Sequence, residues 1–282
     1  MEAFFGAAGK ADSFKGKSSL QIPEYLSKFP LNAYEYQCGR GVNVTQENAI
    51  AFGKEAQKYG IKLSLHAPYF ISLSSVEESK RIGSVKYITD SAAAAKAMGA
   101  TRIVVHSGSC SKMSREEALS LAKETLKMAK AELVNLHLDD VHICPETMGK
   151  INQLGTLDEV MELCLVDESF IPCIDFGHLN ARTMGGLATK EDFAKILDTI
   201  ENRLGKEKLN SFHAHFSKIE YSNGGEKKHL TFADTNFGPD YTYLVELIAQ
   251  KALTPTIICE SAGTQSEDAF TMRELYKNIC LK

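Results

Sequence analysis

KLSLHAPY, at residues 62–69, is a short apolar run that ends in a metal-binding side chain, His66. Such a run is typical of a buried strand. Five further runs have the same design: RIVVHSG (102–108), HICPETM (142–148), CIDFGH (173–178), SFHAHF (211–216) and IICES (257–261). Six such runs predict a ring of metal ligands around one cavity, because each ligand would lie at the mouth of its own strand.

Two further apolar runs, AFFGAAG (3–9) and NAYEYQC (32–38), bring the expected strands to eight. Segments with helical periodicity lie between the strands, including those at 45–60, 114–136 and 190–204. Thr45, Ser114 and Thr189 are each followed by acidic residues, as at helix starts. The strands recur about every 25 to 40 residues, the repeat expected of βα units.

Eight βα units in a chain of 282 residues predict an α/β fold, a (β/α)8 TIM barrel. An open doubly wound sheet is the alternative, although a Gly-rich phosphate turn is missing after the first strand. No linker-like segment divides the chain, so we expect a single domain over residues 1–282. Residues 217–240 read as one long loop, and loops of that length are usually functional.

The composition is that of an ordinary globular enzyme, with 44% hydrophobic and 24% charged residues. No signal peptide or membrane-spanning stretch is evident, and seven unpaired-looking cysteines favour a reducing compartment. We therefore expect a cytoplasmic monomer with no membrane partner. The net charge of −4 argues weakly against nucleic acid, but three divalent ions would raise it to about +2.

Histidine nitrogen and carboxylate oxygen are the ligands that an open zinc site prefers. A single histidine is more often structural, but a set that gathers at the active end of a barrel favours metal binding. Strand alternation places His213 and His215 on one face, so spacing alone leaves open which of them is the ligand.

The chain resembles the endonuclease IV family of the xylose-isomerase-like TIM barrels over nearly its whole length. The resemblance is carried by HAPYFISL (66–73), VVHSGS (104–109), PETMG (145–149) and CIDFGH (173–178). It implies a first zinc at His66 and His106, with Glu146 as the catalytic residue that bridges to a second zinc. The remaining implied ligands are Asp175, His213 and Glu260 for the second ion, and His178 and His229 for the third. His213 is preferred to His215 because Lys218 then falls at the family's spacing.

Two segments depart from the family pattern. Lys227 stands where the family has the aspartate of the third zinc site, so either Glu226 replaces that aspartate or the third site is weak or absent. The loop after the second strand, residues 37–41, also differs from the family's DNA-reading loop. Tyr69 matches a tyrosine that the family inserts at the lesion, and Arg40 is the candidate for similar work. These departures indicate a divergent branch.

The resemblance implies a zinc-dependent phosphodiester hydrolase, an apurinic/apyrimidinic endonuclease of base excision repair that acts on abasic sites in DNA. Two or three zinc ions are implied, with manganese as the alternative metal. A single-metal sugar isomerase or epimerase of the same superfamily is the second hypothesis, with Glu146, Asp175, His213 and Glu260 as its ligands. A non-catalytic nucleic-acid-binding or metal-binding barrel is the third.

Overall fold

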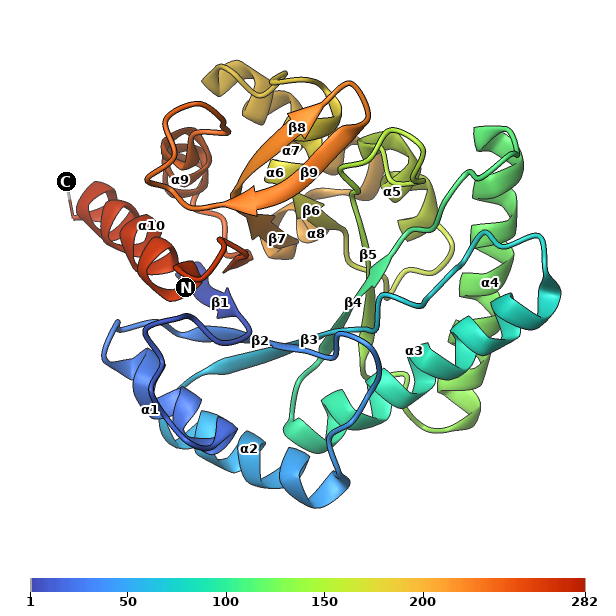
Figure 1. Ribbon diagram of the computed structural model, residues 1–282, viewed down its shortest axis with the longest axis horizontal. Coiled ribbons are helices and arrows are strands. Elements are labelled where there is room, and N and C mark those ends of the chain that lie inside the picture. The colour runs from blue at the N-terminus through green and yellow to red at the C-terminus, as the bar shows by residue number, and fades with distance from the viewer. Residues whose placement is uncertain (1, 282) are drawn as a thin grey trace.

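The computed structural model describes residues 2–281 as a closed parallel barrel surrounded by helices (Figure 1). The barrel strands are β1 (Phe4–Ala8), β2 (Ala33–Gln37), β3 (Lys62–His66), β4 (Arg102–His106), β5 (His142–Glu146), β6 (Cys173–Asp175), β7 (His213–Phe216) and β10 (Thr256–Cys259). Their order around the barrel is β1-β10-β7-β6-β5-β4-β3-β2, and every neighbouring pair is parallel. The expected TIM barrel is confirmed, and all eight predicted runs form its strands.

Helices connect the strands and cover the outside of the barrel (Figure 1). They are a short 3-10 helix, η1 (Ser19–Gln21), and α1 (Ile22–Ser27), α2 (Gln46–Lys58), α3 (Glu78–Met98), α4 (Arg115–Asn135), α5 (Leu157–Cys164), α6 (Phe176–Arg182), α7 (Lys190–Leu204), α8 (Lys206–Ser211), α9 (Tyr241–Gln250) and α10 (Gln265–Cys280). No helix within residues 2–281 combines the length and the apolar character that crossing a bilayer requires.

Local sequence signals set several helix boundaries. Ser114 accepts a hydrogen bond from the backbone of Glu117, whose side chain bonds back to Ser114, so a capping box begins α4. The Thr45 side chain likewise accepts from the backbone of Asn48 at the start of α2, and α3 ends at Gly99, whose φ of 76° suits glycine. These caps satisfy backbone groups that would otherwise lack partners at the helix ends.

The segment 217–240 is not the open loop that its sequence predicts. It contains an antiparallel hairpin of β8 (Lys218–Ser222) and β9 (Gly225–Leu230), which lies outside the barrel order. The turn falls at Asn223 and Gly224, and Gly225 has a φ of 89°. The hairpin lies beside α6 (Figure 1), and its residues Glu226 and His229 line the same cavity as His66 and Glu146.

Candidate metal centre

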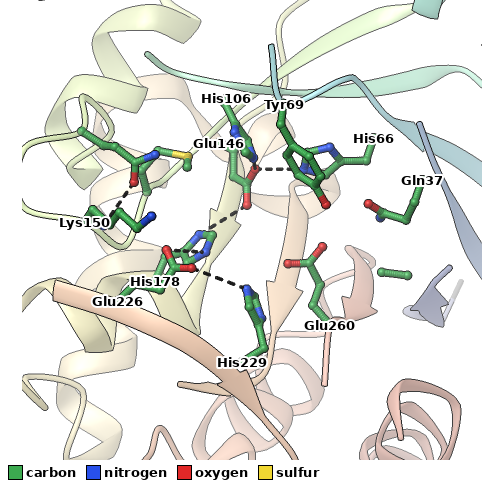
Figure 2. A pocket seen from close by; sticks show the side chains of 13 residues that line it. Gln37, His66, Tyr69, His106, Glu146, Lys150, His178, Glu226, His229 and Glu260 are labelled. Atoms are coloured by element: carbon green, nitrogen blue, oxygen red, sulfur yellow. Dashed lines mark hydrogen bonds and ion pairs between the residues drawn. The ribbon is translucent and has the colours of Figure 1, made fainter. Parts of the chain in front are cut away.

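Five of the candidate ligands converge because each lies at the same end of a parallel strand. His66, His106, Glu146 and Asp175 are the last residues of β3, β4, β5 and β6, and Glu260 directly follows β10. Carboxyl ends of parallel strands meet at one rim of a barrel. Here His66, His106, Glu146 and Glu260 line a cavity of about 540 Å³, into which the labelled side chains of Figure 2 point.

The first cluster joins His66, His106 and Glu146. One carboxylate oxygen of Glu146, Oε2, lies 3.3 Å from His66 Nε2 and 3.4 Å from His106 Nε2. The other ring nitrogen of His66 bonds to the carbonyl oxygen of Ala67 at 2.8 Å, which fixes the ring orientation. Two Nε2 atoms therefore face one carboxylate oxygen, as they would around a shared cation.

The second cluster uses the other oxygen of Glu146. Its Oε1 lies 3.1 Å from His215 Nδ1, and that nitrogen lies 3.6 Å from Glu260 Oε2. Asp175 belongs to the same group, and its buried Oδ2 atom has no hydrogen-bond partner but lies 3.2 Å from His178 Nδ1. Three carboxylates and one histidine share this largely buried space, and such a concentration of negative charge fits a divalent cation.

His215, and not the preferred His213, is the histidine that the structure groups with Glu146, Asp175 and Glu260. In the β6–β7 register, Asp175 is opposite His215, whereas His213 is opposite Cys173. Residues two apart share a face but differ in depth by about 6.5 Å, so His213 lies one layer deeper. Lys218, whose spacing favoured His213, instead donates to the carbonyl oxygen of Phe232 at 2.9 Å.

The third cluster brings together α6 and the hairpin. His178 Nε2 lies 3.4 Å from Glu226 Oε2, and His229 Nε2 lies 3.9 Å from Glu226 Oε1. Lys227, by contrast, pairs with Glu220 on the hairpin. Glu226 thus places a carboxylate beside His178 and His229, in the role that the family's aspartate would have and that Lys227 cannot take.

Glycine makes the approach of the hairpin possible. A Cβ atom on Gly149, in the loop after β5, would lie 2.6 Å from the Cβ of Glu226 and 2.9 Å from the ring of His178. Any larger residue would push the third cluster apart. The glycine of the PETMG segment therefore has a steric role beside the ligands.

Burial and mutual charge set the protonation of the clusters. Burial opposes ionisation of Glu146, but the charge of His215 and hydrogen bonds from histidines hold its pKa well below the usual range. Burial also disfavours a charged His66, yet Glu146 raises the pKa of His66 to about 9. Burial lowers the pKa of His106 to about 3 and raises that of Glu260. Protonated histidines thus balance the negative charge of the carboxylates, a role that a bound metal cation would take over.

The two candidate substrate-binding residues, Tyr69 and Arg40, differ in their position relative to the cavity. The Tyr69 side chain is 57% exposed at the cavity mouth, with its ring centroid 5.6 Å from that of His66 and 5.4 Å from that of His106. Arg40 is exposed on the loop after β2 and is not among the side chains that line the cavity. That loop nevertheless contacts the Tyr69 segment, because the Tyr69 amide donates to the carbonyl oxygen of Gly39 at 3.0 Å.

Several lining residues were not predicted from the sequence. Gln37, Lys150 and Gln153 also line the cavity, and Figure 2 shows Lys150 at one side of it, near Glu226 and His178. Gln37 is the last residue of β2, so its position at a strand end was a signal. The sequence signal for Lys150 was weaker, since this residue only follows the PETMG segment.

Comparison with known proteins establishes the family. Residues 24–277 match the model of the xylose isomerase-like TIM barrel, and the chain belongs to this family. It is 33% identical over 277 residues to an uncharacterised protein of Methanocaldococcus jannaschii, covering 98% of this chain and 97% of that protein. It is also 27% identical over 177 residues to a probable endonuclease 4 of Thermoplasma acidophilum, covering 62% and 59% of the two chains. The resemblance to a divergent branch of the endonuclease IV family is thereby confirmed.

Solved structures share the fold at lower identity. Endonuclease IV from Thermus thermophilus superposes with a TM-score of 0.71 at 18% identity, covering 98% of both chains. A D-tagatose 3-epimerase-like protein also gives 0.71, at 20% identity, covering 98% of this chain and 96% of that one. Because nuclease and epimerase-like barrels superpose equally well, the choice between functions depends on the site.

Proposed function

We propose that this protein is a zinc-dependent phosphodiester hydrolase that cleaves DNA at abasic sites. The observation that carries the proposal is the arrangement of three ligand clusters around Glu146, each with its ligand atoms within 4.8 Å of one another. The ligand set comprises His66, His106, Glu146, Asp175, His178, His215, Glu226, His229 and Glu260. Bound divalent ions supply Lewis acidity and lower the pKa of water, which is the chemistry that phosphodiester hydrolysis requires.

The protein residues contribute position and charge. Glu146 extends one carboxylate oxygen to each of two clusters, which sets the clusters side by side. Lys150 places a cation at the cavity wall, where it suits a phosphate oxygen. Bound divalent cations would offset the acidic ligands, so the negative net charge is compatible with a nucleic-acid substrate.

The rim suits a sugar–phosphate that has left the helical stack. Tyr69 presents a half-exposed aromatic face beside the cavity, and Arg40 lies on the loop that hydrogen-bonds to the Tyr69 backbone. An abasic nucleotide loses little stacking energy when it flips out, and an aromatic side chain can take the vacant space. Tyr69 and Arg40 are therefore proposed as DNA contacts. We further propose that the enzyme works as a cytoplasmic monomer.

The test combines metal content with cleavage. Protein purified without chelator should contain zinc at two or more ions per chain and should cut a duplex with one abasic site. A duplex of the same sequence without the lesion is the matched control. Fully metallated protein that leaves the abasic duplex intact, with zinc or with manganese, would refute the proposal. Tight lesion binding without cleavage in either metal would instead favour a non-catalytic barrel.

A second candidate function is sugar isomerisation or epimerisation with a single metal. It is favoured by one observation, the grouping of Glu146, Asp175, His215 and Glu260 as a complete four-residue ligand set. That set leaves the His66–His106 pair and the hairpin cluster without a role. One ion per chain together with activity on ketoses would select this function over the hydrolase.

A further inference from the structure

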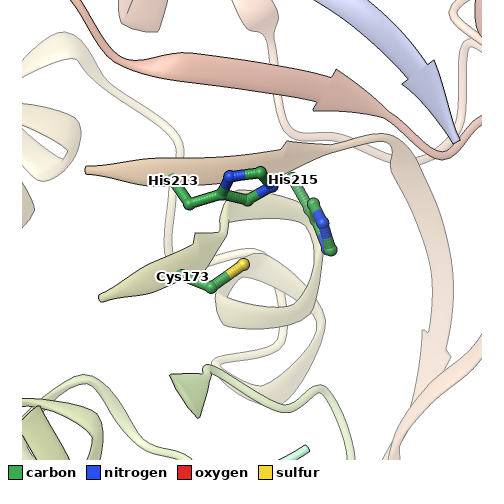
Figure 3. A group of neighbouring side chains, drawn as sticks. All are labelled: Cys173, His213 and His215. Carbon is green, nitrogen blue, oxygen red and sulfur yellow. The ribbon is translucent and has the colours of Figure 1, made fainter. Parts of the chain in front are cut away.

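A fourth group of ligand-type side chains lies deeper in the barrel than the three clusters described above. It consists of Cys173 on β6 and His213 and His215 on β7, which Figure 3 shows close together. Glu35 on β2 completes the group, with its Oε2 atom 3.0 Å from His213 Nε2 and its Oε1 atom 2.9 Å from His215 Nε2. The side chains of all four residues are 0% exposed.

Three of the four histidine nitrogens of this inner group have no hydrogen-bond partner, whereas the fourth, His215 Nδ1, bonds to Glu146 Oε1 at 3.1 Å. Both ring nitrogens of His213 and the Nε2 atom of His215 are buried and unpaired. Two of these atoms lie within 3.0 Å of the Glu35 carboxylate, yet neither contact has hydrogen-bond geometry. Buried polar atoms are almost always hydrogen-bonded, so this concentration of unpaired nitrogens requires an explanation.

A cation between these side chains would satisfy them. Thiolate, imidazole and carboxylate are together the ligand types of zinc and other borderline-soft divalent metals, whereas calcium and magnesium take oxygen ligands. The sulfur and the two imidazoles each offer an atom within 4.8 Å of the others. The carboxylate of Glu35 already touches both rings, and its negative charge would favour a cation there.

We propose that Cys173, His213 and His215, with Glu35, form an additional buried metal site for a zinc-like divalent cation. This site shares His215 with the second cluster but differs from all three mouth clusters, because it contains a thiol and because Cys173 and His213 lie one layer deeper. His215 links the two levels. Its Nδ1 atom faces Glu146 and Glu260, and its Nε2 atom faces Glu35.

The burial of the site has a kinetic consequence. An ion there is surrounded by side chains that solvent does not reach, so it exchanges only when the barrel end opens. We therefore expect chelator to remove the inner ion more slowly than the ions at the mouth. The proposal does not depend on the substrate of the enzyme, and failure to cut abasic DNA would leave it intact.

Cobalt substitution tests the site by its sulfur ligand. The whole protein is stripped with chelator under mild denaturant, refolded and titrated with Co²⁺ alone. We expect near-ultraviolet absorption from thiolate-to-cobalt charge transfer, because the three mouth clusters supply only nitrogen and oxygen ligands. Cys173→Ser should lose this absorption and bind one cobalt ion fewer per chain.

Cys144→Ser is the matched control. Cys144 is also fully buried and packs in the same small cluster as Cys173, but it belongs to no metal-ligand group among residues 2–281. That variant should keep the charge-transfer absorption. Wild-type protein saturated with cobalt that shows no such absorption would overturn the proposal, as would absorption that persists in Cys173→Ser. If Cys173→Ser does not fold, His213→Ala keeps the thiol and should shift or abolish the band.

Discussion

The two ends of the barrel interior carry opposite charges. Toward the carboxyl ends of the strands, Glu35, Glu146 and Asp175 are completely buried among histidines. At the amino ends, Lys62 begins β3 and the buried Arg102 begins β4. The guanidinium of Arg102 contacts the hydroxyl of Thr256 at 3.5 Å, and the Lys62 ammonium lies 4.3 Å from the centroid of the Phe4 ring.

The difference between the two ends indicates which of them can bind metal ions. Isolated charges at the amino end are tolerated by partial exposure, a hydroxyl and an aromatic ring. The carboxyl end instead concentrates several buried carboxylates beside histidine nitrogens without hydrogen-bond partners, an arrangement that is expensive without cations. Chemistry is therefore expected only at the acidic end.

Removing the carboxylate of Glu146, which two clusters share, should have the largest effect on cleavage. Glu146→Gln keeps the shape but loses the charge that faces two clusters, so we expect cleavage to fall by roughly 10²–10⁴-fold. Steady-state kinetics on an abasic duplex and metal analysis would measure both losses. Glu159→Gln is the control, because Glu159 pairs with Arg115 at 2.7 Å outside the cavity. Equal activity of Glu146→Gln and wild type would remove Glu146 from the site.

Stripping the metals should destabilise one end selectively. Each ion present at 100 times its Kd adds about 2.7 kcal/mol to the free energy of unfolding. Chelation should therefore lower Tm, and amide exchange should accelerate in the β8–β9 hairpin and at the carboxyl ends of the strands. Metal restored to the same sample is the control. An equal loss of amide-exchange protection at both ends of the barrel would contradict the claim that only the carboxyl end binds metal ions.

The positive charge of Lys150 at the acidic rim should affect substrate binding more than the chemical step. Lys150→Met removes the positive charge from the cavity wall, so we expect KM to rise about tenfold, equivalent to about 1.4 kcal/mol, with kcat little changed. The salt dependence of KM should weaken in parallel. A fall in kcat with constant KM would indicate instead that Lys150 acts on the transition state.

The smallest effect is expected at the amino end. Burial, followed by the charge of Arg102, lowers the pKa of Lys62 to about 8 from 10.5. Between these two pH values the unfolded chain binds more protons than the folded one, so the Lys62 contribution raises stability as pH increases. Below pH 8 both states are protonated, and the cost of burying the charge is fully present.

Lys62→Met should therefore raise the free energy of unfolding at neutral pH by about 1 kcal/mol or less and flatten its rise between pH 8 and 10.5. Urea unfolding at several pH values measures this. Metal content and cleavage should match wild type, since Lys62 is remote from the cavity. A variant that loses metal would mean that the two ends are coupled.

The sequence by itself determined the barrel and most of the ligand ring. Strand periodicity, helix caps and the position of a polar residue after an apolar run are local features, so they can be read along the chain. His66, His106, Glu146, Asp175 and Glu260 were found in this way, because a residue at a strand end has only one rim to occupy. Their roles as ligands and the single-domain expectation stay predictions.

Tertiary structure alone decided the depth and the partners of the remaining residues. His213 and His215 have the same parity, and only the register between β6 and β7 places His215 beside Asp175. Glu35 lies in an alternating strand and gives no sign that it faces two histidines. Glu226 reaches His178 because segment 217–240 pairs with itself as a hairpin. Register and hairpin docking depend on contacts between segments distant in sequence, and a local pattern does not contain them.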